Sequence, residues 1–156
     1  MGSNIGKRKS NLNAAYNLIQ DDVGAITEAS AMYRTEAWGP VAQMAFYNQV
    51  VRINTPLSPH NLLKKVLYIE EKMGRIKDNR WGPRIIDIDI LYYHDKIINQ
   101  RHLTLPHPQI PNRKFALVPL CEIAPDFRHP ALGMTNDQLL KICTDQMAVR
   151  RLGAKP

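Results

Sequence analysis

The stretch Arg80-Trp81-Gly82-Pro83-Arg84-Ile85-Ile86-Asp87-Ile88-Asp89-Ile90-Leu91 is dominated from Arg84 onward by β-branched residues. Gly82 and Pro83 mark its start and no helical period fits it, so the sequence predicts a strand over residues 84–91. Successive side chains of a strand point to opposite faces. We therefore expect Asp87 and Asp89 on one face and Ile86 and Ile88 on the other.

The two acidic residues could hold a metal ion. Alternate residues of a strand lie about 6.6 Å apart, so both carboxylates can converge on one divalent cation or bracket two. Carboxylates this close repel each other unless a cation lies between them, and Mg²⁺ with a substrate phosphate is a common solution. Nearby bases could bind that phosphate; they are Arg75, Lys77, Arg80 and Arg84.

A simpler interpretation is a solvated strand face whose acids pair with neighbouring arginines, and a short Asp-x-Asp motif alone favours it. The apolar strand around the acids argues the other way, because an unpaired charge is costly there. The preceding loop also carries a tryptophan flanked by Arg80 and Arg84. Acidic residues that could hold a metal ion, next to basic residues that could bind phosphate, suit phosphoryl chemistry.

Length and composition predict one compact domain over residues 1–156, since the chain is 44% hydrophobic and long enough for a core. The net charge of +7, from 21 basic and 14 acidic residues, points to an anionic partner such as a nucleotide, a nucleic acid or an acidic membrane. Cys121 and Cys143 lack metal-ligand spacing and predict reduced thiols. With no apolar run of membrane-spanning length, we expect a cytoplasmic protein.

The first half of the chain predicts two helices and two strands. Apolar residues from Leu12 to Ile19 recur at helical spacing, and Ser58 with Pro59 opens a second helix that stops at Gly74. Strands over residues 26–34 and 46–53 should pair as antiparallel neighbours. This order places a helix directly before the acidic strand.

The last third of the chain begins with prolines. Pro106, Pro108 and Pro111 exclude a helix and predict a rigid extended arm over residues 103–115. A helix should begin near Phe115 and pack on the sheet, and Thr135 opens a last helix with a capping box. Residues 150–156 are expected to fray.

The connection over residues 35–45 is unusually long for a hairpin, and such loops are often functional. Trp38 with Phe46 and Asn48 could clamp a flat heterocycle by stacking and hydrogen bonding. Alternatively, the two aromatic residues fill a small satellite core. These residues alone leave both interpretations open.

Taken together, these motifs resemble the 6-hydroxymethyl-7,8-dihydropterin pyrophosphokinase family nearly end to end. The matching segments are Gly2-Ser3-Asn4-Ile5-Gly6, Tyr33-Arg34-Thr35, Trp38-Gly39-Pro40, Gln43, Phe46, Asn48, Glu70, Gly74-Arg75, Arg80-Trp81-Gly82-Pro83-Arg84, Asp87-Ile88-Asp89, Leu105-Pro106-His107-Pro108, Arg113 and Phe115. The resemblance implies a ferredoxin-like α+β sandwich, an antiparallel sheet with helices packed on one face. It also implies an enzyme that transfers pyrophosphate from ATP to the pterin, giving AMP and the pterin diphosphate.

The resemblance further implies roles for individual residues. Catalytic positions are Arg75, Arg84, Asp87 and Asp89, of which Asp87 and Asp89 hold two Mg²⁺ ions. ATP-contacting positions are Glu70, Lys77, Trp81, Ile90, Thr104, His107, Pro108 and Arg113. The pterin pocket is formed by Thr35, Trp38, Gly39, Phe46, Asn48 and Phe115. The expected partners are these two small molecules, with no nucleic acid or membrane, and the expected state is a monomer.

Family members carry several strand residues ahead of the motif that matches Gly2-Ser3-Asn4, near the middle of the sheet. We therefore expect a truncated first strand here, and a chain extended upstream to melt at a higher temperature. Smaller departures at Glu36, Leu67 and His102 bear on affinity rather than on the reaction.

Two other functions are conceivable from the sequence. A basic ferredoxin-like domain could bind RNA, but the sheet lacks the aromatic signature of such domains and its two acids would repel a phosphate backbone. An inactive relative could bind pterin or nucleotide without turnover. The joint presence of Asp87, Asp89, Arg75 and Arg84 argues against an inactive relative.

Overall fold

The computed structural model describes residues 1–36, 43–75 and 82–153. The strands along these residues are β1 (Gly2–Ser3), β2 (Ala25–Ala29), β3 (Tyr33–Thr35), β4 (Phe46–Asn48), β5 (Val51–Asn54), β6 (Ile98–Gln100), β7 (Leu103–Leu105) and β8 (Val149–Arg151). The helices are α1 (Arg8–Asp22), α2 (Pro59–Lys72), α3 (Lys114–Ile123) and α4 (Asn136–Ile142), with a 3₁₀ turn at Ile110–Asn112. The expected α+β class is confirmed.

The strands form antiparallel sheets. Four of them pair in the order β1-β4-β3-β8, while β2 pairs with β5 and β6 with β7. The two strands expected at 26–34 and 46–53 do pair with each other, but each is broken once, into β2 and β3 and into β4 and β5. At the break the Ser30 hydroxyl accepts a hydrogen bond from the Val50 amide at 3.0 Å, so a side chain takes the place of a ladder carbonyl.

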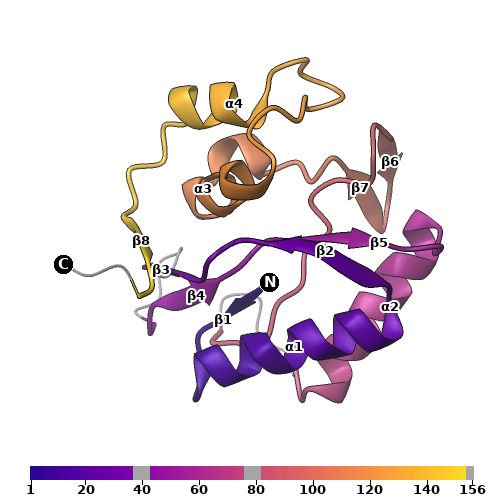
Figure 1. The fold of residues 1–156 in the computed structure, drawn as a ribbon, viewed down its shortest axis with the longest axis vertical. Helices are drawn as coiled ribbons and strands as arrows, with labels where there is room; N and C mark the ends of the chain where they lie inside the picture. The colour runs from indigo at the N-terminus through magenta and orange to yellow at the C-terminus, as the bar shows by residue number, and fades with distance from the viewer. Residues whose placement is uncertain (37–42, 76–81, 154–156) are drawn as a thin grey trace.

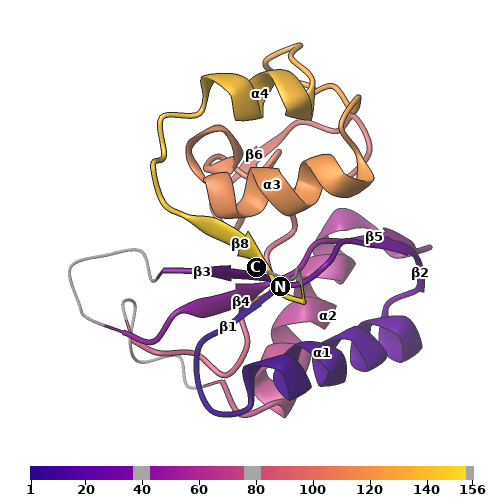
Figure 2. The ribbon, with the colours of Figure 1, turned by 60° about the vertical axis from the view of Figure 1, so that its left-hand side comes forward.

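The helices cover both faces of the sheet layer, not the single face that we expected. Figures 1 and 2 show α1 and α2 on one side and α3 and α4 on the other. The predicted apolar stripe of α1 is buried, and the Ser58 side chain caps α2 as predicted. The capping box of Thr135 and Gln138 is present at α4. None of the described helices is long and apolar enough to cross a membrane.

Residues 84–91 are extended, but within the described part of the chain they pair with another strand at one point only. Gly2 and Asp87 exchange both backbone hydrogen bonds, each 2.8 Å long, whereas the regular strand predicted here is absent from the described residues. The predicted alternation of faces is correct. Ile86 is fully buried and Ile88 and Ile90 pack on the core beside α1 and α2, while the side chain of Asp87 opens to the cavity described below.

Two expectations for the C-terminal part are wrong. Residues 149–151 do not fray but form β8 against β3, where Arg151 also pairs with Glu122 of α3 at 3.1 Å. The proline arm holds a 3₁₀ turn at Ile110–Asn112. Such a turn tolerates proline in its first positions, because those amides have no partner inside the helix. The Leu105–Pro106 peptide bond of this arm is cis.

Candidate functional site

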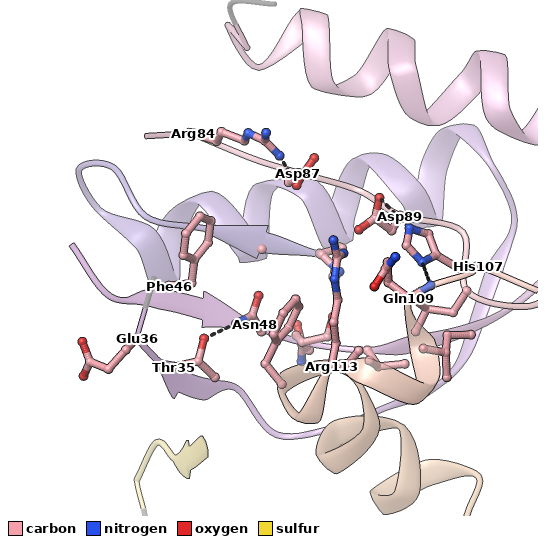
Figure 3. A pocket seen from close by; sticks show the side chains of 18 of the residues that line it. Thr35, Glu36, Phe46, Asn48, Arg84, Asp87, Asp89, His107, Gln109 and Arg113 are labelled. Atoms are coloured by element: carbon pink, nitrogen blue, oxygen red, sulfur yellow. Dashed lines mark hydrogen bonds and ion pairs between the residues drawn. The ribbon is translucent and has the colours of Figure 1, made fainter. Parts of the chain in front are cut away.

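A cavity of about 300 Å³ opens where β1, β3, β4, the 82–91 segment, the proline arm and the start of α3 meet. Its lining is Met1, Gly2, Thr35, Glu36, Gln43, Phe46, Asn48, Gln49, Val50, Gly82, Arg84, Asp87, Asp89, Leu91, His107, Gln109, Ile110, Arg113, Phe115 and Ala116. Figure 3 shows Arg84, Asp87 and Asp89 along the extended segment, facing Asn48 and Arg113 across the opening. We call the side of the cavity with Arg84, Asp87 and Asp89 its charged end, and the side with Phe46 and Asn48 its aromatic end.

Asp87 lies between two arginines. Its Oδ1 is 2.8 Å from Arg75 and its Oδ2 is 2.6 Å from Arg84. Asp89 is more open: 45% of its side chain is exposed, and its Oδ1 lies 4.0 Å from His107 Nε2. The two carboxylates line the same cavity, as the strand alternation predicted, with different electrostatic surroundings.

Glu70 on α2 supports the charged end through contacts with the Ile88 amide and with Arg75. It is 3% exposed, accepts a hydrogen bond from the Ile88 amide at 2.7 Å and forms an ion pair with Arg75. Burial raises the pKa of its carboxyl group, while the Ile88 hydrogen bond and Arg75 lower it. Glu70 therefore links α2 to the acidic segment and fixes Arg75 beside Asp87.

The donors present fit Mg²⁺ when phosphate supplies the other ligands. Among the described residues, no cluster of three or more histidine, cysteine or acidic side chains could hold a metal by itself. Mg²⁺, however, prefers oxygen ligands and is usually held by one or two carboxylates plus substrate phosphates. Asp87 and Asp89 provide that number of carboxylates, and the arginines beside them suit the phosphates.

The other end of the cavity combines an oriented side-chain amide with aromatic surface. Asn48 of β4 donates a 2.7 Å hydrogen bond to the Thr35 hydroxyl of β3, which fixes the orientation of its amide. A Cβ atom on Gly2 would lie only 2.7 Å from Asn48 Oδ1, so glycine is needed for β1 to approach so closely. Phe46 and Phe115 add aromatic surface to the lining.

The proline arm contributes a histidine held in a neutral form. His107 Nδ1 accepts a hydrogen bond from the Gln109 amide at 3.2 Å, which leaves Nε2 as the protonated nitrogen toward Asp89. Burial lowers the pKa of His107; Asp89 raises it and Arg113 lowers it. The Arg113 guanidinium lies 5.6 Å from the centre of the Phe115 ring, so arginine and aromatic ring occupy one wall.

Most of the residues expected at the site come together. Those that line the cavity are Thr35, Phe46, Asn48, Arg84, Asp87, Asp89, His107, Arg113 and Phe115. Arg75 and Glu70 lie directly behind it. Three other expected residues lie away from its lining: Ile90 packs on the core, while Thr104 and Pro108 are exposed. Trp38, Gly39, Lys77 and Trp81 lie outside the described residues.

Asn4 is a positioning residue that we did not expect from the sequence. It is 1% exposed, its Oδ1 accepts a hydrogen bond from the Arg84 amide at 2.6 Å, and its Nδ2 donates to Gln43 at 3.0 Å. Its place in the Gly2–Gly6 motif, which matches the family, was the available signal, but the motif alone assigned it no role. Gln43 and Gln109 also line the cavity without having been predicted there.

Comparisons with known proteins give a consistent result. Residues 1–125 match the family model of 7,8-dihydro-6-hydroxymethylpterin-pyrophosphokinase (HPPK). The 2-amino-4-hydroxy-6-hydroxymethyldihydropteridine pyrophosphokinase of Synechocystis sp. is 43% identical over 142 residues, which cover 90% of this chain and 72% of that protein. The proteins of the same name from Methylorubrum extorquens and Haemophilus influenzae are 45% identical over 127 residues (81% and 80% covered) and 36% identical over 153 residues (97% and 92% covered).

Proposed function

The chain belongs to the HPPK family, and from that premise we propose how its cavity carries out the family's reaction. In this reaction pyrophosphate passes from ATP to 6-hydroxymethyl-7,8-dihydropterin, which yields the pterin diphosphate and AMP in folate biosynthesis. One observation supports the proposal most strongly. A single cavity joins a charged end, with Asp87 and Arg84, to an aromatic end with an oriented Asn48 amide.

The charged end takes the triphosphate of ATP. Asp87 and Asp89 would hold two Mg²⁺ ions, which would supply positive charge beside the phosphates. Arg84 and Arg75, both within 2.8 Å of Asp87, donate hydrogen bonds to the phosphates. His107, whose Nε2 lies 4.0 Å from Asp89, and Arg113 contact the nucleotide.

The aromatic end takes the pterin. Asn48 hydrogen-bonds the edge of the ring, with its orientation fixed by Thr35, while Phe46 and Phe115 stack on the ring faces. A site that hydrogen-bonds a polar ring edge rejects alcohols that lack one, because its own buried polar groups would then be left unpaired. Selection of the pterin thus follows from the Asn48 and Thr35 pair.

The chemistry requires positioning more than acid–base catalysis. The pterin hydroxymethyl oxygen attacks the β-phosphorus of ATP, and the bond from that phosphorus to the oxygen shared with the α-phosphate breaks, so AMP leaves with that oxygen. Phosphoryl transfer is accelerated chiefly by alignment and by stabilisation of charge on the phosphate oxygens. Arg75, held by Glu70, and Arg84 supply this stabilisation from fixed positions.

We also propose that the chain acts as a cytoplasmic monomer.

Separate binding measurements test this division of the cavity. Asn48→Ala should weaken binding of the fluorescent ligand 6-hydroxymethylpterin about 10-fold or more, since one or two ring hydrogen bonds are lost. The same change should leave the affinity for a non-hydrolysable MgATP analogue unaltered. Asp89→Asn should instead weaken binding of the MgATP analogue and leave the affinity for 6-hydroxymethylpterin unaltered. If Asn48→Ala weakened nucleotide binding instead, the two ends would be assigned the wrong way round.

A further inference from the structure

Helix α3 is held near each of its ends by a carboxylate that lies outside the cavity lining. α3 carries Phe115 of the aromatic end in its first turn, and Arg113, at its N-cap, also lines the cavity. The two carboxylates belong to Asp145, in the chain between α4 and β8, and to Glu122, in the last turn of α3. Figures 1 and 2 show the chain after α4 passing beside α3 on its way to the sheet. The position of α3 therefore depends on contacts made away from the cavity.

Asp145 holds the start of α3. Its Oδ2 accepts a hydrogen bond from the Lys114 amide at 2.9 Å, and its Oδ1 accepts one from the Met147 amide at 2.9 Å, which fixes the carboxylate in its own turn. The first amides of a helix have no partner inside the helix, and a negative charge beside them is favourable. The N-cap residue Arg113 cannot take this role, because a guanidinium group has no acceptor. Asp145 therefore fixes the peptide between Arg113 and Phe115.

Glu122 joins the last turn of α3 to the sheet. Its Oε2 accepts hydrogen bonds from the Tyr33 hydroxyl at 2.8 Å and from the Ala31 amide at 3.0 Å. Its Oε1 accepts one from Arg151 of β8 at 3.1 Å. Tyr33 is 8% exposed, and burial, followed by the Glu122 carboxylate, raises the pKa of its hydroxyl, so this group remains a donor. One carboxylate thus binds α3 to two neighbouring strands.

Glu122 and Tyr33 lie on the same faces of α3 and β3 as the residues of the aromatic end. Phe115 and Glu122 are about two turns apart and share one face of the helix. Tyr33 is paired with Asn48 in the register of β3 and β4, and Thr35 shares their face of the sheet because side chains alternate along a strand. The contact of Glu122 with Tyr33 therefore sets the helix face with Phe115 on the strand face with Asn48.

We propose that Asp145 and Glu122 are positioning residues, which act on the substrates through α3 without touching them. Glu122 sets the separation of Phe115 from Asn48, and so acts on the aromatic end alone. Asp145 fixes the peptide that Arg113 and Phe115 flank, and so acts on both walls that these residues form. The inference rests on the assignment of the aromatic end to the pterin and of Arg113 to the nucleotide.

Affinities for the two ligands test the role of Glu122. Glu122→Leu should weaken binding of 6-hydroxymethylpterin about 10-fold, because small displacements of positioned groups are costly, and leave the affinity for a non-hydrolysable MgATP analogue unaltered. Glu122→Gln keeps an acceptor oxygen for Tyr33 and should restore most of the pterin affinity. Tyr33→Phe, which removes one hydroxyl group and is the milder change, should weaken pterin binding about 3-fold.

The same two measurements separate Asp145 from Glu122. Asp145→Ala should weaken binding of both ligands about 5-fold, since Arg113 and Phe115 shift together, and Asp145→Asn, which keeps an acceptor oxygen, should recover part of each loss. Gln146→Ala, at the exposed neighbouring residue, should change neither affinity. Loss of pterin affinity alone in Asp145→Ala, or no loss at all, would overturn the role given to Asp145.

Two reference variants distinguish positioning from other causes. Thr135→Ala removes the cap of α4 and should lower the Tm without changing either affinity; a loss of pterin affinity there would mean that reduced stability alone accounts for the effects, and would overturn the inference. Asn48→Ala tests the premise. If it weakened pterin binding while Glu122→Leu and Tyr33→Phe did not, the role of Glu122 alone would be wrong. If none of the three weakened pterin binding, the assignment of the aromatic end would fail, and this inference with it.

Discussion

At the scale of single residues, Asp89 is the most direct test of the charged end. Asp89→Ala should reduce kcat roughly 10³-fold or more, because a carboxylate that holds the metal and its phosphates is lost. The fold should persist, since 45% of this side chain is exposed and its removal leaves no buried charge unpaired. Steady-state kinetics and Tm are measured together. Asp95→Ala, at an exposed acid a few residues further along the chain, is the control, and undiminished turnover in Asp89→Ala would contradict the assignment.

Gly2 tests the aromatic end from the backbone side. Gly2→Ala should raise the KM for the pterin about 10-fold, because the new methyl group would lie 2.7 Å from Asn48 Oδ1 and must displace that amide. The KM for ATP should change little. In the Asn48→Ala background the same substitution should have no further effect on pterin KM. If the two substitutions raised the pterin KM additively in the double mutant, Gly2 would act on pterin binding by a route other than Asn48.

At the scale of elements, the helix ends were the most predictable features. Caps depend on residues close in sequence, and Ser58 and the Thr135 capping box lie where the sequence places them. Thr135→Ala should lower stability by about 1 kcal/mol and the Tm by about 2–4 °C. It should leave kcat unchanged, since α4 does not line the cavity. Thr144→Ala, exposed beyond the same helix, should alter neither value; a drop in kcat for Thr135→Ala would contradict this separation.

The strands were less predictable because their pairing depends on distant residues. The alternation of Ile86, Asp87 and Ile88 follows from sequence, but whether residues 84–91 form a ladder depends on a neighbour, and β1 supplies only one bridge. Similarly, β8 depends on its pairing with β3 and on the ion pair of Arg151 with Glu122. No local sequence pattern predicts these long-range contacts.

The candidate site likewise contains some residues whose roles can be predicted from local sequence and others whose roles depend on distant residues. Asp87, Asp89 and the arginines are visible as a local motif. Asn4 is not, because its role depends on Arg84 and Gln43, which are 80 and 39 positions away along the chain. Residues whose roles arise from long-range hydrogen bonds therefore remain hidden from the sequence alone.

At the scale of the whole molecule, stability should decline on mild acidification. Burial lowers the pKa of His129 below the ordinary 6.5, and its Nδ1 accepts hydrogen bonds from the Ala131 and Leu132 amides, both at 3.3 Å. The unfolded chain therefore binds the proton more readily, so the stabilisation is complete above pH 6.5 and is lost as the pH falls through the lowered pKa.

The Tm measured between pH 7.5 and 5 tests this effect. The wild-type chain should lose several degrees over that range, and His129→Asn should lose fewer. His60→Asn, at an exposed histidine, should retain the wild-type slope. If Tm fell equally with pH in the wild type and in His129→Asn, His129 would be excluded as the source of the acid sensitivity. His107, whose pKa is also lowered by burial, would then be the next residue to substitute.

The central claim is that this cavity moves two phosphoryl groups together. The most direct measurement incubates the chain with 6-hydroxymethyl-7,8-dihydropterin and ATP labelled with ³²P at the α-, β- or γ-position, with Mg²⁺ or with excess EDTA. We predict that β- and γ-label both pass to the pterin, that α-label stays in AMP, and that EDTA abolishes transfer. Transfer of γ-label alone, with ADP as the other product, or release of label as free phosphate would contradict it.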